Sequence, residues 1–495
     1  MLVFATPYQR RWFLPFFIFM VSVVLAITQQ EPWLLVIPFL WILIPPSFNY
    51  FIKDTEQLFW LLFLVLPLST EWSLNPSLGL DFPDEIFMWL LTGICIVKLI
   101  HTPKWFPNSL ATHPLFLVLG IYFLWLAITI VFSVEPILSV KFVLAKIWFI
   151  IPFVMLPQIL LSSMDRIRKM ALCLVVPMLL VVVQVLIRHS FYALSFESIK
   201  KIMSPFFRNH VNYSSMLVCL LPVGWCFWKL TPRESNTRKW ILMGLIIGLI
   251  GLLFAYSRGA WIALLAGIGV VWVLRRKWMG ILILLSISGI MVSTVWLVTD
   301  KNFMRFVPDH DRTVYNTDFG KHMMATVALK DVSNAERFYR WVAGARMLTE
   351  KPITGFGPNT FYLHYRPYTV NRFQTWVSDN PEHSTVHNYF ILVALEQGII
   401  GLLLFCLLYF GMLLAVQRIY HQLQSRFYQT VTLATASILI MIGVINCSSD
   451  MIETDKVGSL FWLCLGMIIL LDTKLKEEKL TLASSQFSPI ITPIS

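Results

Sequence analysis

Long apolar runs dominate the pattern of hydrophobic and polar positions along the chain. Their lengths approach the roughly 20 residues that a helix needs to cross a membrane. The expected spans lie near residues 12–28, 33–51, 57–68, 85–101, 114–133, 139–160, 168–188, 212–229, 240–256, 259–274, 279–299, 388–416, 428–447 and 456–472. The pattern therefore predicts an all-α polytopic membrane protein with about 12–14 transmembrane helices.

The composition supports this fold class and argues against a soluble domain and a membrane β-barrel. Of the 495 residues, 57% are hydrophobic and 13% are charged, whereas a soluble domain carries about a quarter charged residues. A β-barrel is excluded because its strands alternate apolar and polar residues. The first run follows Arg10 and Arg11 as in a signal peptide, but it lacks a small-x-small cleavage site, so we expect an uncleaved first helix.

The basic residues predict the orientation of the chain in the membrane. Clusters of Lys and Arg occur in alternate connections, at 10–11, 98–104, 166–169, 233–239, 275–277, 418–426 and 474–479. The positive-inside rule places these connections, and both termini, in the cytoplasm. It also accounts for much of the net charge of +12, so we expect membrane lipids around the chain and no nucleic acid partner.

The opposite side receives the longest connection, residues 300–387. We expect an N-terminal transmembrane bundle at 1–299, an outer loop domain at 300–387, C-terminal transmembrane helices at 388–472 and a cytoplasmic tail at 473–495. A connection of this length usually carries function. Within it, "SNAERFYRWVAGARMLTEKP" predicts a helix capped by Ser333 or Asn334. "GFGPNTF" predicts a tight turn, in which Gly355 and Gly357 allow unusual backbone angles.

Four arginines are placed on or near the outer face: Arg208, Arg258, Arg337 and Arg340. Arginines at helix ends often only extend to the membrane interface, and this interpretation stays open for Arg208. Arg337 and Arg340 lie one turn apart and could equally form a solvated helix face. Arg258 occupies the very short turn of "AYSRGAW", where a guanidinium with fixed donors suits a phosphate group.

A histidine opens the apolar run "HNYFILVALEQGIIGLLLF", which begins at His387. The positive end of a helix macrodipole disfavours imidazolium, so the ring should be neutral near pH 7 and able to act as a general base. It could instead be an ordinary interfacial histidine. A metal site with His383 is the other alternative, but there is no HExxH motif and no evident third ligand. We therefore expect no metal and no cofactor.

Glu396 is an acidic residue inside the same apolar run. An acid at this depth is a functional candidate, but it could equally anchor packed elements where Gly398 and Gly401 allow close approach. Lys146, inside another expected span, is a candidate partner for it. Arginines and a neutral base at the outer surface together suit a lipid-linked diphosphate sugar displayed on the outer leaflet.

From "RNHVNYSSML" onward, the sequence resembles the O-antigen ligase and O-antigen polymerase superfamily. The parts follow the family order: "SRGAW" at the start of a span, "ERFYRWVAGARMLTEKPITGFGPNTF" in the long loop, and then "HNYFILVALEQGIIGLLLFCLLYF". The resemblance implies transfer of a glycan from an undecaprenyl-diphosphate carrier to an acceptor hydroxyl, without metal, at the periplasmic face of the bacterial inner membrane.

The resemblance also implies roles for individual residues. His387 would deprotonate the acceptor, and Arg258 and Arg337 would bind the diphosphate. The remaining assignments are Arg208 and Arg340 as further diphosphate ligands, and Asn388, His383, Tyr213 and Glu396 in support.

The superfamily leaves the acceptor open. Ligases attach glycan to lipid A core, polymerases extend another lipid-linked glycan, and some relatives glycosylate protein. Other relatives have been labelled bicarbonate transporters. A transporter should place charged residues near the bilayer midplane, whereas the candidates here gather at one face, which favours an enzyme. The joint presence of the histidine, the loop arginine and the SRG turn favours a ligase, with a polymerase as the alternative.

Overall fold

The computed structural model describes residues 54–75, 78–307, 332–375, 378–379 and 384–486. The chain divides into two units, Met1–Leu61 and Leu62–Ser495. Apart from the first residues of α3, which belong to the first unit, all elements described below lie within the second unit. The expected spans near 12–28 and 33–51 lie outside the described residues. The expected boundaries between the N-terminal bundle, the loop domain, the C-terminal helices and the tail, at residues 299, 387 and 472, remain a prediction.

Ten helices in the described part of the chain are long and apolar enough to cross a membrane. The main helices are α6 (Pro114–Val131), α7 (Pro136–Ile150), η4 (Ile151–Met155), α8 (Leu156–Leu160), α9 (Met164–Ser190), α11 (His210–Leu230), α12 (Asn236–Leu253), α13 (Arg258–Arg275), α14 (Met279–Val298), α18 (Tyr389–Gln422), α19 (Arg426–Asn446) and α20 (Asp455–Gln486). The prediction of an all-α polytopic membrane protein is confirmed.

The shorter elements connect or cover the long helices. They are α3 (Thr55–Val65), η2 (Leu66–Leu68), β1 (Thr70–Asn75), β2 (Leu78–Phe82), α4 (Asp84–His101), η3 (Pro103–Trp105), α5 (Asn108–Ala111), α10 (Ile199–Ile202), η5 (Thr299–Phe306), α16 (Val332–Glu350), α17 (Phe361–His364), η6 (Arg366–Tyr368), η7 (Asn371–Phe373) and η8 (Met451–Glu453). The expected spans near 57–68 and 85–101 are both helical, as the apolar runs predict.

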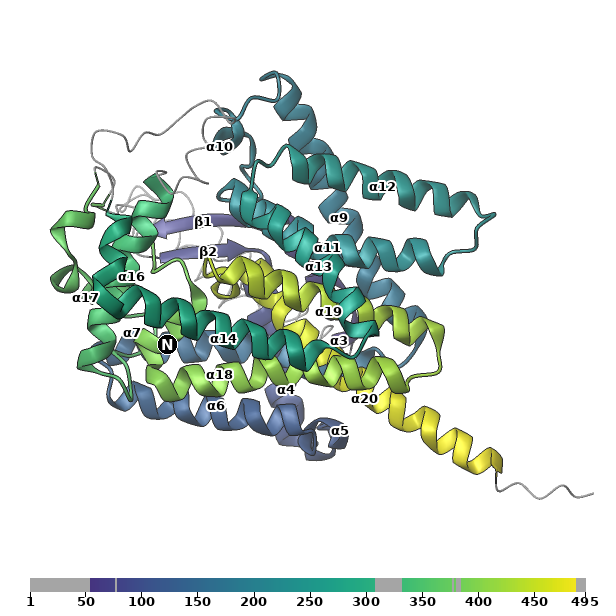
Figure 1. Cartoon of the computed structure of the whole chain (residues 1–495). Coiled ribbons are helices and arrows are strands. Elements are labelled where there is room, and N and C mark those ends of the chain that lie inside the picture. Colours follow the sequence, from purple (N-terminus) through teal and green to yellow (C-terminus); the bar gives the residue numbers. More distant parts are fainter. Residues whose placement is uncertain (1–53, 76–77, 308–331, 376–377, 380–383, 487–495) are drawn as a thin grey trace, which may run out of the picture. The chain divides into compact units, whose positions relative to one another are not determined.

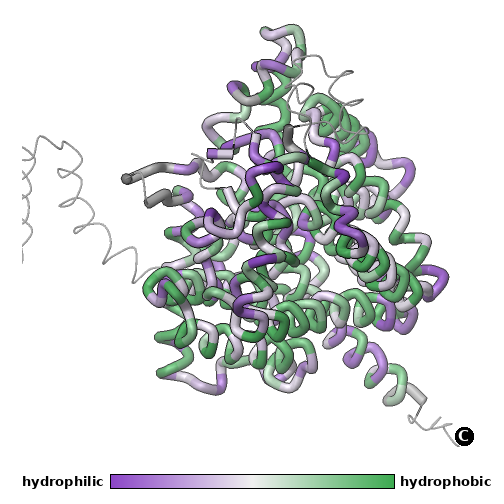
Figure 2. The backbone as a smooth tube through the Cα atoms, turned by 60° about the vertical axis from the view of Figure 1, so that its left-hand side comes forward, coloured by the Kyte–Doolittle hydropathy of each residue, from purple (hydrophilic) through white to green (hydrophobic). Residues whose placement is uncertain are grey.

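The long helices run side by side, and α19 and α20 are the most enclosed of them (Figure 1). α19 packs against α11, α13 and α18, and α18 packs against α6. Along these helices the residues are mainly apolar, while polar residues gather at helix ends and connections (Figure 2). α14 exposes nearly its whole apolar surface, as expected of a helix whose solvent is lipid rather than water.

α16 and α17 lie at the end of the bundle where α18 begins (Figure 1). α16 packs against α18, and α17 also contacts it. Ser333 and Asn334, expected as caps, lie inside α16, which already includes Val332. β1 and β2 form an antiparallel pair in the connection between η2 and α4, an element that the apolar runs do not reveal.

Candidate functional site

The segment 385–389 leads into α18 and carries His387. Asn388 caps the helix, because its Oδ1 accepts a hydrogen bond from the Ile391 amide at 3.1 Å. The Asn388 amide group also donates to the Cys447 carbonyl at 2.9 Å, and the Tyr389 amide donates to the Ser449 carbonyl at 3.0 Å. The start of α18 is therefore held against the segment that follows α19.

Two side chains of α16 hold the other side of this segment. Arg340 donates from Nη1 to the Thr385 carbonyl at 3.0 Å, and Trp341 donates from Nε1 to the Val386 carbonyl at 3.0 Å. The Thr385 hydroxyl donates to Asp450 Oδ2 at 2.7 Å. The backbone before His387 is thus fixed by contacts from both α16 and the segment after α19.

The backbone of His387 lies in the left-handed region, with φ at +53°. Non-glycine residues adopt this conformation rarely and at an energetic cost of about 1–3 kcal/mol. The contacts on both sides of the residue supply the restraint that such a conformation needs. Local strain of this kind is common where a side chain must point in a set direction.

The imidazole of His387 is half-buried and lies in a positive field. Burial, and then the charges of Arg340 and Arg337, lower the pKa of His387 to about 3. The ring is therefore neutral near pH 7, and burial is the largest cause, followed by the charges of the two arginines. A neutral ring retains a nitrogen lone pair that can accept a proton.

The two arginines of α16 have different surroundings. Arg340 is buried, and its Nη2 lies 3.4 Å from Glu336 Oε2. Glu336 in turn accepts a hydrogen bond from Ser378 Oγ at 2.5 Å. Arg337 is half-buried and donates from Nη1 to Asn334 Oδ1 at 3.3 Å. Arg340 thus fixes the segment before His387 through the Thr385 carbonyl. The charge of Arg337 contributes to the low pKa of the His387 imidazole.

Arg258 is the first residue of α13. The next residue, Gly259, faces the segment after α19, where an added Cβ would lie 3.7 Å from Ser448 Oγ. Ser448 stands between the two residues whose carbonyls bind Asn388 and Tyr389. The turn that carries Arg258 and the segment that carries His387 therefore adjoin the same short stretch of chain.

Arg208 and Tyr213 lie in other surroundings. Arg208 Nη1 is 3.8 Å from Glu71 Oε1 of the hairpin. Tyr213 of α11 is fully buried against α12. A Cβ added to Gly251 of α12 would lie 2.9 Å from the Tyr213 hydroxyl. The described contacts of Arg208 and Tyr213 are thus with the hairpin and with α12.

Glu396 holds the GFGPNTF turn against α18. Its Oε2 accepts from the Asn359 amide at 2.8 Å, and its Oε1 accepts from the Phe361 amide at 3.1 Å. Gly355 and Gly357 have positive φ angles, +68° and +108°, as the sequence predicts. An added Cβ on Gly355 would lie 2.5 Å from the Glu396 carbonyl carbon, so the close approach requires glycine.

Lys146 does not pair with Glu396. Its Nζ lies 2.6 Å from Glu453 Oε2, in the connection between α19 and α20. The proposed partnership between Lys146 and Glu396 is therefore wrong. Of the two interpretations of Glu396, the contacts favour the anchor.

Sequence patterns also miss several residues of this network, namely Glu336, Thr385 and Asp450. The signal for Asp450 is present but weak: two acids, Asp450 and Glu453, stand in a short outer connection between apolar runs. His383 lies outside the described residues. In the part of the chain that the structure describes, no group of three or more His, Cys, Asp or Glu residues is placed to hold a metal ion.

Comparison with known protein families finds a match to part of the chain. Residues 243–406 match the model of a family described as O-Antigen ligase. The matched range contains Arg258, Arg337, Arg340 and His387, and it begins after Arg208 and Tyr213. No curated protein matches the chain. Residues 243–406 are thus similar to the O-antigen ligase family, which supports the resemblance that the motifs indicate.

Proposed function

We propose that this membrane glycan transferase moves a glycan from an undecaprenyl-diphosphate carrier to an acceptor hydroxyl at the periplasmic face of the bacterial inner membrane. The acceptor oxygen attacks the first sugar carbon, and the bond from that carbon to the diphosphate oxygen breaks. The proton of the hydroxyl passes to His387, and the diphosphate leaves on its carrier. Lipid A core is the proposed acceptor.

The neutral imidazole beside Arg337 is the observation that carries the proposal. General-base catalysis needs an unprotonated group at a fixed position, and His387 is held by restraints from two sides. A diphosphate needs positive charge nearby, which Arg337 and Arg258 would supply. Arg340 supports the same site mainly by fixing the Thr385 carbonyl.

The charges also suggest an order of events. With a pKa of about 3, His387 is neutral but only weakly basic in the protein alone. Because the arginine charges contribute to this low value, a bound diphosphate would offset them and raise the pKa of the ring. His387 would then become a better base once the donor is in place, which limits proton transfer before the donor binds.

Transfer by the purified protein tests this function and identifies the acceptor. The protein is mixed with an undecaprenyl-diphosphate glycan and either lipid A core or a second carrier-linked glycan, and the products are identified by mass. We expect glycan on lipid A core. Product formed only on the second carrier would instead assign the protein as a polymerase. Absence of product with both acceptors, despite donor binding by folded protein, would contradict the proposal.

A further inference from the structure

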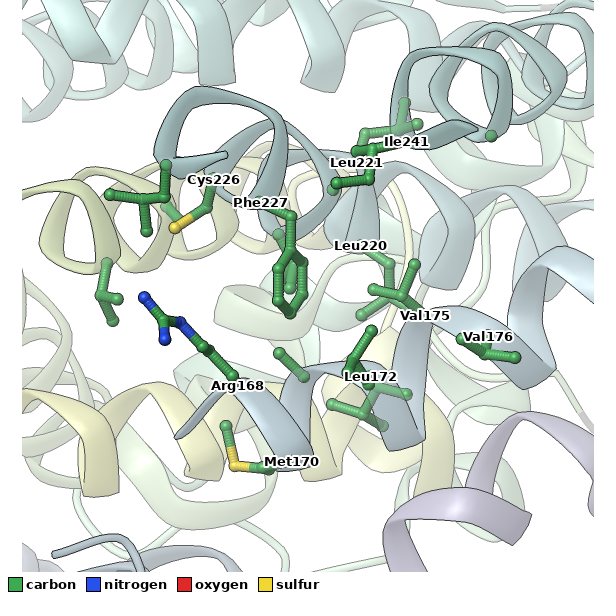
Figure 3. A pocket seen from close by; sticks show the side chains of 18 of the residues that line it. Arg168, Met170, Leu172, Val175, Val176, Leu220, Leu221, Cys226, Phe227 and Ile241 are labelled. Atoms are coloured by element: carbon green, nitrogen blue, oxygen red, sulfur yellow. The ribbon is translucent and has the colours of Figure 1, made fainter. Parts of the chain in front are cut away.

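A large apolar cavity lies within the bundle, away from the candidate site. It has a volume of about 640 Å³ and is bounded by α9, α11, α12, α19 and α20. The lining side chains are almost all aliphatic or aromatic, with Arg168 at one end of the cavity (Figure 3). Representative lining residues are Leu172, Val175, Leu220, Leu221, Phe227 and Ile241.

The cavity has about the length of half a bilayer. On α9 its lining runs from Ile167 to Leu179, and on α12 from Thr237 to Gly248. At a rise of 1.5 Å per residue these stretches span about 16–18 Å, against about 15 Å for half of a 30 Å hydrocarbon core. The dimensions therefore suit a hydrocarbon chain from a single leaflet.

The cavity is closed towards the candidate site. One turn beyond Gly248, an added Cβ on Gly251 would lie 2.6 Å from Val182 Cγ1 and 2.9 Å from the Tyr213 hydroxyl. These distances show that α9, α11 and α12 touch closely at this level. A lipid chain whose headgroup sits near His387 would have to pass this contact to enter the cavity between α9, α11 and α12.

The other end of the cavity is basic and aromatic. Arg168 lies over the Phe427 ring at 5.1 Å, with Nη1 2.9 Å from the exposed carboxylate of Asp165. Two neighbouring cations lie over tryptophan rings, Lys229 over Trp225 at 4.8 Å and Arg238 over Trp228 at 4.3 Å. Basic and aromatic residues together are typical of sites at the level of lipid headgroups, where cations attract anionic lipids.

We propose that this cavity binds an acyl chain of an anionic phospholipid from the leaflet at the basic end of the bundle, which is the cytoplasmic leaflet in the orientation given above. The phosphate of the headgroup lies against Arg168, Lys229 and Arg238. The Asp165 carboxylate, which is exposed, turns outward when the phosphate takes its place beside Arg168. This lipid site is separate from the glycan-transfer site and does not depend on the proposed reaction.

Native mass spectrometry of the full chain tests the lipid site directly. The delipidated protein is titrated with dioleoyl phosphatidylglycerol, dioleoyl phosphatidylethanolamine and undecaprenyl diphosphate. We expect tight binding of one phosphatidylglycerol and weaker binding of the zwitterionic lipid. Equal binding of the two phospholipids would overturn the anionic assignment, and displacement of phosphatidylglycerol by undecaprenyl diphosphate would assign the cavity to the donor's chain instead.

Matched variants locate the bound lipid. Val175→Trp fills the cavity, whereas Val183→Trp makes the same change on the same helix outside its lining. We expect lipid binding to be lost only in Val175→Trp. Should that variant fail to fold, Leu172→Trp gives the same test, because Leu172 is half exposed at the cavity mouth. Binding that survives in a folded cavity-filling variant would overturn the proposal.

A second pair of variants tests the charge. Arg168→Gln should weaken phosphatidylglycerol binding about fivefold, the effect of one cation near a membrane surface. Arg276→Gln removes a cation from the same end of the bundle, but Arg276 does not line the cavity. An equal loss of binding in both variants would show general attraction to the membrane surface and would contradict a defined headgroup site.

Discussion

Replacement of Glu396 by alanine gives a quantitative test of how the outer loop is held on α18. The carboxylate is buried and accepts two backbone hydrogen bonds, from Asn359 at 2.8 Å and from Phe361 at 3.1 Å. The substitution leaves both amides without this acceptor. A buried polar group that loses its partner costs about 1–3 kcal/mol, so we expect Glu396→Ala to lower the free energy of unfolding by about 2–6 kcal/mol.

The effect is measured as the apparent free energy of unfolding of the purified protein in mixed micelles. Glu396→Gln keeps one carbonyl oxygen as an acceptor, so we expect it to cost about half as much, about 1–3 kcal/mol. Glu350→Ala is the matched control. Glu350 is an exposed glutamate of the same outer segment that accepts one hydrogen bond from Tyr368, and its loss should cost under about 1 kcal/mol.

Glycan transfer per folded molecule separates an anchor from a reacting group. If Glu396 only anchors the loop, the activity of Glu396→Gln should follow its folded fraction. The reasoning is refuted if Glu396→Ala is as stable as Glu350→Ala. A fully folded Glu396→Gln without transfer activity would assign the carboxylate to the chemistry.

Three further predictions concern the arginines, the histidine and the orientation of the chain. Arg258→Lys should lose most transfer activity, because a bidentate phosphate contact needs the planar guanidinium; full activity at normal protein levels would show that only a cation at the interface is required. Arg337→Gln removes a positive charge that lowers the pKa of His387, so the pKa should rise, and the acid limb of the kcat/KM profile should move to higher pH; an unchanged limb would contradict the electrostatic account. A cysteine at the exposed residue Asn371, in a chain without other cysteines, should react with an impermeant thiol reagent in cells with a permeable outer membrane; labelling only after lysis would reverse the orientation.

The sequence predicts the membrane helices well because their signal is local. An apolar run of sufficient length becomes a helix in lipid, where the backbone must satisfy its own hydrogen bonds. The run after His387 therefore gives α18, with Asn388 as its cap. The hairpin at β1 and β2 is missed because two short strands leave no comparable pattern in a polar connection.

The site is less predictable because its contacts join distant parts of the chain. The spacing of Arg337 and Arg340 does not distinguish their surroundings, and only packing shows that Arg340 holds the Thr385 carbonyl. Likewise, Lys146 and Glu396 look like possible partners by charge and depth, yet Lys146 meets Glu453 instead. Residue type and spacing suggest which groups can react, whereas pairing depends on how the helices pack.

Transfer by the His387→Ala variant tests the central claim most directly. The purified variant should fold and bind the undecaprenyl-diphosphate donor, while its transfer rate falls by about 10²–10⁴-fold, the usual contribution of a general base. His364→Ala, which removes another half-buried histidine of the outer segment, should leave the rate nearly unchanged. Normal transfer by folded His387→Ala would contradict the proposed mechanism.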